Sequence, residues 1–126
     1  MLTQKEMEKY IKGWEKRKNK KEKELSQKRK KAIKKAHTIG KKLKEIYNVD
    51  KVVLFGSIVE DKFWGHSDID IAIKDIKEEN YLEVYNEMLE IAFPFKLDLI
   101  LLEKAPASLK KKIKNKGVEI WLKMIF

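Results

Sequence analysis

Hydrophobic residues recur at helical spacing through most of the first 47 residues. The first apolar face consists of Met7, Tyr10, Ile11 and Trp14. Residues 15–24 contain no apolar side chain, and the helical spacing resumes between residues 32 and 47. This pattern predicts helix over residues 3–47, interrupted or bent in the middle. Its second half has the pattern of a core helix, whereas the first stripe needs the domain, a second copy or a partner to cover it.

After Asn48, a plausible helix-ending residue, the spacing changes to that of short strands. Residues 51–55 and 95–102 are apolar runs typical of buried strands. Residues 68–73 alternate polar and apolar side chains, which indicates a strand with one covered face.

Two further helices are expected between and after these strands. The spacing over residues 78–92 predicts an amphipathic helix with Leu82, Tyr85, Leu89 and Ala92 inward. Pro106 is expected to open a short basic helix that ends near Gly117, before a last strand segment at residues 118–122. We therefore predict an α/β (α+β) domain: a small mixed sheet of three or four strands with helices packed on one face, preceded by a long charged N-terminal helix.

The charge is concentrated at one end of the chain. Of the 126 residues, 40% are charged, against about a quarter in ordinary proteins. Residues 1–51 hold 19 Lys and Arg against 7 Asp and Glu, while residues 52–126 hold 11 against 13. We predict a basic helical extension over residues 1–28 and one domain over residues 29–126. The extension is either a nucleic-acid-binding surface or a solvated helix of Glu/Lys pairs of the kind that thermophile proteins use; the presence of only two Arg favours the second.

Composition also excludes several classes. No Cys is present, so disulfides and thiolate metal sites are excluded. No apolar run approaches the roughly 18 residues that cross a bilayer, and the N-terminus lacks a signal pattern. We expect a cytoplasmic protein without a membrane partner.

The first candidate for chemistry is Gly56-Ser57, at the end of a predicted strand. A strand that turns at Gly into a helical turn leaves backbone N–H groups pointing outward, which suits an anion such as a triphosphate. Gly-Ser alone is also compatible with an ordinary turn.

The second and third candidates are carboxylates on strands. Asp68 and Asp70, two positions apart on a strand, lie on one face about 6–7 Å apart. Like charges so placed favour a hard cation such as Mg²⁺, unless the face is simply solvated. Asp98 interrupts the apolar run 95–102; it either pairs with Lys96 or faces Asp68 and Asp70 as a third metal ligand.

Taken together, these residues resemble the DNA polymerase β-like nucleotidyltransferase superfamily. Its pattern is Gly-Ser, about ten residues, Asp-x-Asp on a strand and a lone Asp on a later strand, and the segment VVLFGSIVEDKFWGHSDIDIAI is similar to the minimal nucleotidyltransferase branch. The resemblance covers residues 30–122. It implies that Gly56 and Ser57 hold nucleotide phosphates, and that Asp68 and Asp70 bind two Mg²⁺ ions, with Mn²⁺ as an alternative. Asp98 would then ligate one metal and assist deprotonation of the acceptor hydroxyl.

The same resemblance identifies supporting residues and one departure. Ser67 precedes the first Asp and is expected to shape the nucleotide-binding loop. Members of the family usually carry an Arg-containing, Gly-ended stretch after Gly-Ser, where this chain has Ile58, Val59, Glu60 and Asp61. Lys62 is expected to compensate in part. We interpret His37 and His66 as structural, and Phe63 and Trp64 as a hydrophobic anchor rather than a lid over the base.

The resemblance also implies an activity. It predicts a metal-dependent adenylyltransferase that moves an NMP, most plausibly AMP from ATP, to a hydroxyl acceptor, and acts as the antitoxin of a separate HEPN-domain toxin by modifying a tyrosine. Homo-oligomers are a further option. The alternative is a weak or inactive antitoxin that acts by occlusion or by binding nucleic acid.

Overall fold

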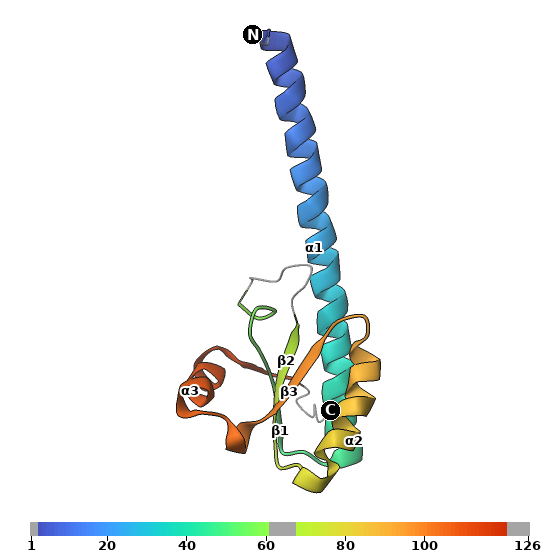
Figure 1. Cartoon of the computed structure of the whole chain (residues 1–126), viewed down its shortest axis with the longest axis vertical. Helices are drawn as coiled ribbons and strands as arrows, with labels where there is room; N and C mark the ends of the chain where they lie inside the picture. The colour runs from blue at the N-terminus through green and yellow to red at the C-terminus, as the bar shows by residue number, and fades with distance from the viewer. Residues whose placement is uncertain (1–2, 61–67, 121–126) are drawn as a thin grey trace, which may run out of the picture.

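Helix α1 (Gln4–Tyr47) is a single helix of 44 residues that runs through the domain and far beyond it (Figure 1). The computed structural model describes residues 3–60 and 68–120. The helix begins at a capping box formed by Thr3 and Glu6 and ends at Asn48, whose φ of 53° is left-handed. The expected end at Asn48 is confirmed. The expected interruption in its middle is wrong, because strong helix formers such as Lys and Glu continue the helix without an apolar face.

Four strands form one mixed sheet in the order β3-β2-β1-β4. Their bounds are β1 (Lys51–Phe55), β2 (Ile69–Lys74), β3 (Leu97–Leu101) and β4 (Val118–Glu119). Strand β1 pairs antiparallel with β2 and β4, and β2 pairs parallel with β3. The predicted small mixed sheet is confirmed.

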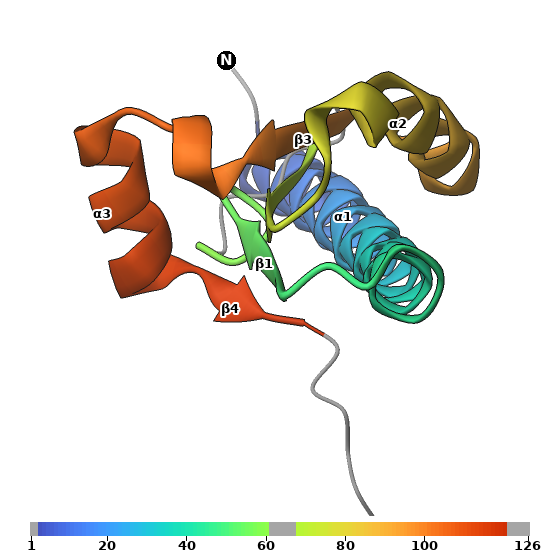
Figure 2. The same cartoon turned by 90° about the horizontal axis from the view of Figure 1, so that it is seen from below.

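Helices cover both faces of this sheet (Figure 2). Helices α1 and α2 (Glu78–Ala92) pack on the face that carries the isoleucines of β2, Ile69, Ile71 and Ile73. Helix α3 (Ala107–Lys116) packs on the opposite face, where Ile113 meets Val53, Phe55 and Ala72. The α/β class is confirmed, but the expectation that all helices lie on one face is corrected. The small apolar set of β1 and β2 that faces away from α1 needs its own cover, and α3 supplies it.

The outer edge of β3 is closed by α2. The hydroxyls of Tyr81 and Tyr85 donate to the carbonyls of Leu99, at 2.5 Å, and Leu97, at 3.0 Å. Strand β3 is an edge strand, so no neighbouring strand donates to these carbonyls, and the tyrosine hydroxyls do so instead. Helix α2 has the predicted bounds, and Ala92 is buried as expected, with Tyr85 and Leu89 partly buried against the core. The expectation for Leu82 is wrong: this residue is 67% exposed, and Val84 and Met88 are buried.

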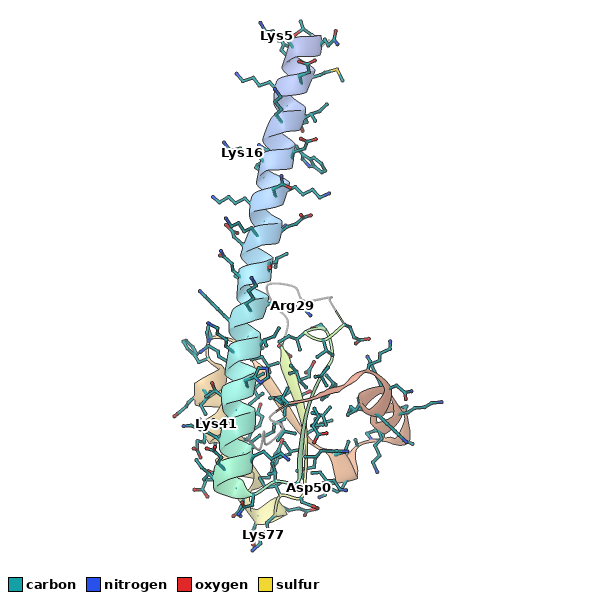
Figure 3. The ribbon with its side chains drawn as sticks, turned by 180° about the vertical axis from the view of Figure 1, so that it is seen from behind. Lys5, Lys16, Arg29, Lys41, Asp50 and Lys77 are labelled. Carbon is teal, nitrogen blue, oxygen red and sulfur yellow. The ribbon has the colours of Figure 1, made fainter. Side chains whose placement is uncertain are left out.

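The N-terminal part of α1 lies outside the domain (Figure 3). Lys5 and Lys16 extend from this part of the helix, and Arg29 lies where the helix reaches the domain. The buried residues of α1 begin only at Ala32. The first apolar face, formed by Met7, Tyr10, Ile11 and Trp14, is exposed to solvent; Trp14, for example, is 52% exposed. Across the described ranges, every helix is too short or too polar to cross a membrane.

Candidate functional site

A sharp turn follows β1 at Gly56. The φ of Gly56 is +82°, a conformation that glycine adopts without steric cost. Both Val59 and Glu60 donate their backbone N–H groups to the Gly56 carbonyl at 3.2 Å, so residues 57–60 form a helical turn. From α1, the Nε of Arg29 donates to the Ile58 carbonyl at 2.9 Å and holds this turn in place.

Ser57 opens that turn and is partly exposed. The N–H groups at the start of a helical turn have no acceptor within the turn, because their partners would precede it. Such donors beside a hydroxyl favour an anion. The strand-to-turn geometry expected at Gly56-Ser57 is therefore present, and it lies next to a carboxylate.

That carboxylate belongs to Asp70. A Cβ on Gly56 would lie 2.2 Å from the Oδ2 atom of Asp70, which only glycine avoids. Asp70 is the register partner of Phe55 on one side and of Asp98 on the other. Residues paired directly across two strands present their side chains on the same face of the sheet. Asp70 and Asp98 therefore lie on the face that α3 covers further along the strands.

The acidic groups repel one another. Burial raises the pKa of the Asp70 carboxyl to about 6, and the nearby carboxylates of Asp98 and Asp68 add to this increase. Asp98 is exposed, and within the described part of the chain no ion pair joins it to Lys96. Because Asp98 is exposed, it is not a charge paired with Lys96 inside the core, and the sheet register sets it beside Asp70.

The donor chemistry fits a divalent cation, although the side chains do not form a closed cage. Over residues 3–60 and 68–120, no three His, Asp or Glu side chains are close enough together to hold a metal by themselves. Mg²⁺ usually takes one or two carboxylates and completes its shell with water and substrate phosphates. Asp70, crowded by two further carboxylates, has hard oxygen ligands, and Lys112 offsets their negative charge only in part, so that a cation would relieve the remaining repulsion.

Ser67, Lys62, His66, Trp64 and Phe63 all lie outside the described residues. His37 is exposed on α1. The nucleotide-binding roles expected for Ser67 and Lys62 therefore stay predictions.

Sequence reasoning missed the partners of Glu60. Its carboxylate accepts a hydrogen bond from Lys116 Nζ at 3.1 Å and forms an ion pair with Lys112 Nζ at 3.7 Å. The acidic residue that departs from the family pattern is thus paired with cations from α3. The spacing of Lys112 and Lys116, four residues apart, shows that they share one helix face, but only the folded chain shows what that face meets.

Comparison with known proteins agrees with this arrangement. Residues 37–124 match the family described as "Polymerase beta, Nucleotidyltransferase". The chain therefore belongs to the polymerase β nucleotidyltransferase family, whose members are transferases. No curated protein matches it significantly.

Solved structures of toxin-antitoxin complexes have a similar fold. A complex crystallised with AMP-PNP is 23% identical with a TM-score of 0.56, over 69% of this chain and 72% of the other. A mutant of the MntA-HepT pair is 27% identical with a TM-score of 0.55, over 67% and 69%. A complex of a tri-AMPylated HEPN toxin with an MNT antitoxin from Shewanella oneidensis is 23% identical with a TM-score of 0.53, over 71% of each chain.

Proposed function

We propose that this protein transfers AMP from ATP to a hydroxyl group on a HEPN-domain toxin, with a tyrosine as acceptor, and thereby acts as its antitoxin. The observation that carries the proposal is the position of Asp70, which lies between the Gly56 turn and Asp98 and is crowded by carboxylates. Family membership supports the reaction class, and the AMPylated HEPN complex supports the acceptor.

In this proposal each group of residues has its own role. Gly56 and Ser57 would bind the phosphates through backbone donors and the Ser57 hydroxyl, with Ser67 and Lys62 assisting from the loop. Asp68, Asp70 and Asp98 would hold one or two Mg²⁺ ions, with Mn²⁺ as a substitute. When bound, the metal neutralises phosphate charge and favours ionisation of the acceptor hydroxyl.

In this proposal Asp98 takes the proton of the acceptor hydroxyl. It is exposed at the edge strand, so an acceptor from another protein can reach it. The acceptor oxygen forms a bond to the α-phosphorus, the bond between that phosphorus and the bridging oxygen breaks, and pyrophosphate leaves. The hydroxyl proton passes to the Asp98 carboxylate.

The direct test incubates the protein with Mg²⁺, α-labelled ATP and a HEPN-domain protein encoded by the adjacent gene. We expect label on the toxin with the wild-type protein and with an Asp50→Asn control, and none with an Asp68→Asn/Asp70→Asn variant. Asp50 is an exposed carboxylate at the start of β1, far along the strand from Gly56. An absence of label with the wild-type protein, or equal label with the double variant, would refute the enzyme.

A second candidate is a protein that binds nucleic acid without catalysis. The only observation that favours it is the basic charge of α1. Residues 4–28 carry 10 Lys and Arg against 5 Asp and Glu on a part of the helix that projects from the domain. A nucleic-acid ligand predicts steeply salt-dependent RNA binding that disappears when residues 1–28 are deleted. The enzyme predicts instead that Mg²⁺ raises the melting temperature and that Asp68→Ala abolishes this shift. If the protein binds its toxin but Mg²⁺ does not raise the melting temperature, an antitoxin that acts by occlusion is favoured.

A further inference from the structure

Helix α3 and the candidate site share one face of the sheet. The side chains of Phe55 and Ala72 lie under α3, packed around Ile113. Asp70 is the register partner of Phe55 and lies two residues before Ala72 on β2, so it presents its carboxylate on that same face. Figure 2 shows α3 on this face of the sheet, opposite α1 and α2, so α3 and the carboxylates of Asp70 and Asp98 lie on the same side of the sheet.

Two lysines occupy that side of α3. Lys112 and Lys116 are four residues apart and both contact the Glu60 carboxylate, at 3.7 and 3.1 Å. The Glu60 side chain is 16% exposed, whereas those of Lys112 and Lys116 are 53% and 60% exposed. The Glu60 side chain is therefore the enclosed partner, whereas more than half of each lysine side chain is exposed to solvent.

Glu60 belongs to the same turn as Gly56. The backbone N–H of Glu60 donates to the Gly56 carbonyl, so the two lysines are held at the turn that follows β1. Lys112 also acts on the site directly. Burial, Asp98 and Asp68 raise the pKa of the Asp70 carboxyl, and Lys112 opposes them. Lys112 is thus near enough to both Glu60 and Asp70 to respond to an anion between them.

The turn itself provides no cation. Its side chains from Ser57 to Glu60 are neutral or acidic, yet a triphosphate carries several negative charges. Lysine ammonium groups are compact point charges suited to phosphate oxygens. We propose that Lys112 and Lys116 of α3 bind the β- and γ-phosphates of the nucleoside triphosphate, and that Glu60 holds them at the Gly56 turn when the site is empty. This inference rests on the proposed nucleotidyl transfer.

The test is nucleotide binding by the full-length protein with Mg²⁺, measured by titration calorimetry with ATP and with AMP at one ionic strength. For the wild-type protein we expect ATP to bind more tightly than AMP. A Lys112→Gln/Lys116→Gln variant should bind ATP about tenfold more weakly or worse while AMP binding changes little, because only the outer phosphates lose their partners. Lys111→Gln, on the same helix next to Lys112, is the matched control and should bind ATP as the wild type does.

The outcomes separate this inference from the proposed function. If the wild-type protein binds no ATP, the nucleotidyltransferase proposal itself fails. If it binds ATP and the double variant binds equally well, the lysine assignment is wrong while the proposed reaction stands. If Lys111→Gln weakens ATP binding as much as the Lys112→Gln/Lys116→Gln variant does, the effect is one of overall charge, and the assignment is again overturned. Equal melting temperatures of the variants confirm that folding is unaffected.

Discussion

The carboxylate of Asp70 lies so close to Gly56 that a Cβ at residue 56 would be 2.2 Å from its Oδ2 atom. Real Cβ contacts are essentially never this short, so one of the two groups would have to move. The turn that would receive phosphate and the carboxylate that would receive metal are therefore one unit. A change in either alters the position of the other.

The first prediction concerns that contact. Gly56→Ala introduces the collision and forces an alanine into the φ of +82° that Gly56 adopts, so we expect the free energy of unfolding to fall by about 2 kcal/mol and ATP binding to be lost. Urea denaturation and calorimetry measure the two effects. Gly13→Ala is the matched control: its Cβ would meet nothing closer than 3.9 Å inside α1, and it should stabilise the helix by up to about 1 kcal/mol. Losses of the same size in both variants would contradict the prediction.

The second prediction concerns pH. The pKa of Asp70 is raised from 3.8 to about 6 in the folded state, so folding favours the protonated carboxyl. The resulting stabilisation is fully present below pH 4, declines as the pH rises through about 6, and is absent above that. In EDTA, Asp70→Asn should therefore melt at a higher temperature than the wild type at pH 8, and the difference should shrink toward pH 4. Melting curves across this range measure it. An Asp70→Asn variant less stable than the wild type at pH 8 would show that the carboxylate is not crowded.

The third prediction concerns the edge strand that carries Asp98. Tyr81→Phe/Tyr85→Phe removes both hydroxyl donors to β3, and each lost hydrogen bond should cost about 1 kcal/mol. Hydrogen exchange should rise first in β3, which has a partner strand on one side only. Tyr10→Phe, 68% exposed on the free part of α1, is the control and should change neither quantity. Unchanged exchange in β3 would mean that α2 holds the strand through packing alone.

The fourth prediction compares the two arginines of the chain. Arg29 donates to the Ile58 carbonyl in the Gly56 turn, whereas Arg17 lies on the exposed part of α1. Arg29→Ala should lower the free energy of unfolding by about 1–2 kcal/mol and weaken ATP binding, since the turn loses a charged donor. Arg17→Ala should leave both unchanged within about 0.5 kcal/mol. Equal behaviour of the two variants in urea denaturation would contradict a role for Arg29 in the turn.

The fifth prediction locates the boundary of the folded domain. Residues 3–24 are all exposed or partly exposed, so deleting residues 1–24 should leave the melting temperature nearly that of the full chain. Deleting residues 1–36 also removes Arg29 and the buried Ala32 and Ala36, and should unfold or strongly destabilise the protein. Thermal denaturation of both forms tests this. A large loss from the shorter deletion would show that the extension packs against something in solution.

The helices and strands could be predicted from the sequence, because each one depends mainly on residues that are close together along the chain. The period-2 alternation around Asp70 and the helical spacing of residues 78–92 place side chains on faces by backbone geometry alone. The residues of the polymerase β-like pattern were likewise visible in order along the chain. Leu82 was misplaced because a helix with two adjacent apolar stripes can turn either one inward, and only the packing against α1 and the sheet selects Val84 and Met88.

Only the tertiary structure decided what surrounds the carboxylates. The parallel register of β2 and β3 sets Asp70 beside Asp98, and the packing of α3 on that face sets Lys112 against Glu60. Glu60 and Lys112 are 52 residues apart, and no periodicity relates positions so distant. The sequence by itself determined which side chains could carry the chemistry, because that depends on their type and local spacing. Their mutual charge balance was decided by the fold, because electrostatic interaction depends on distance in space.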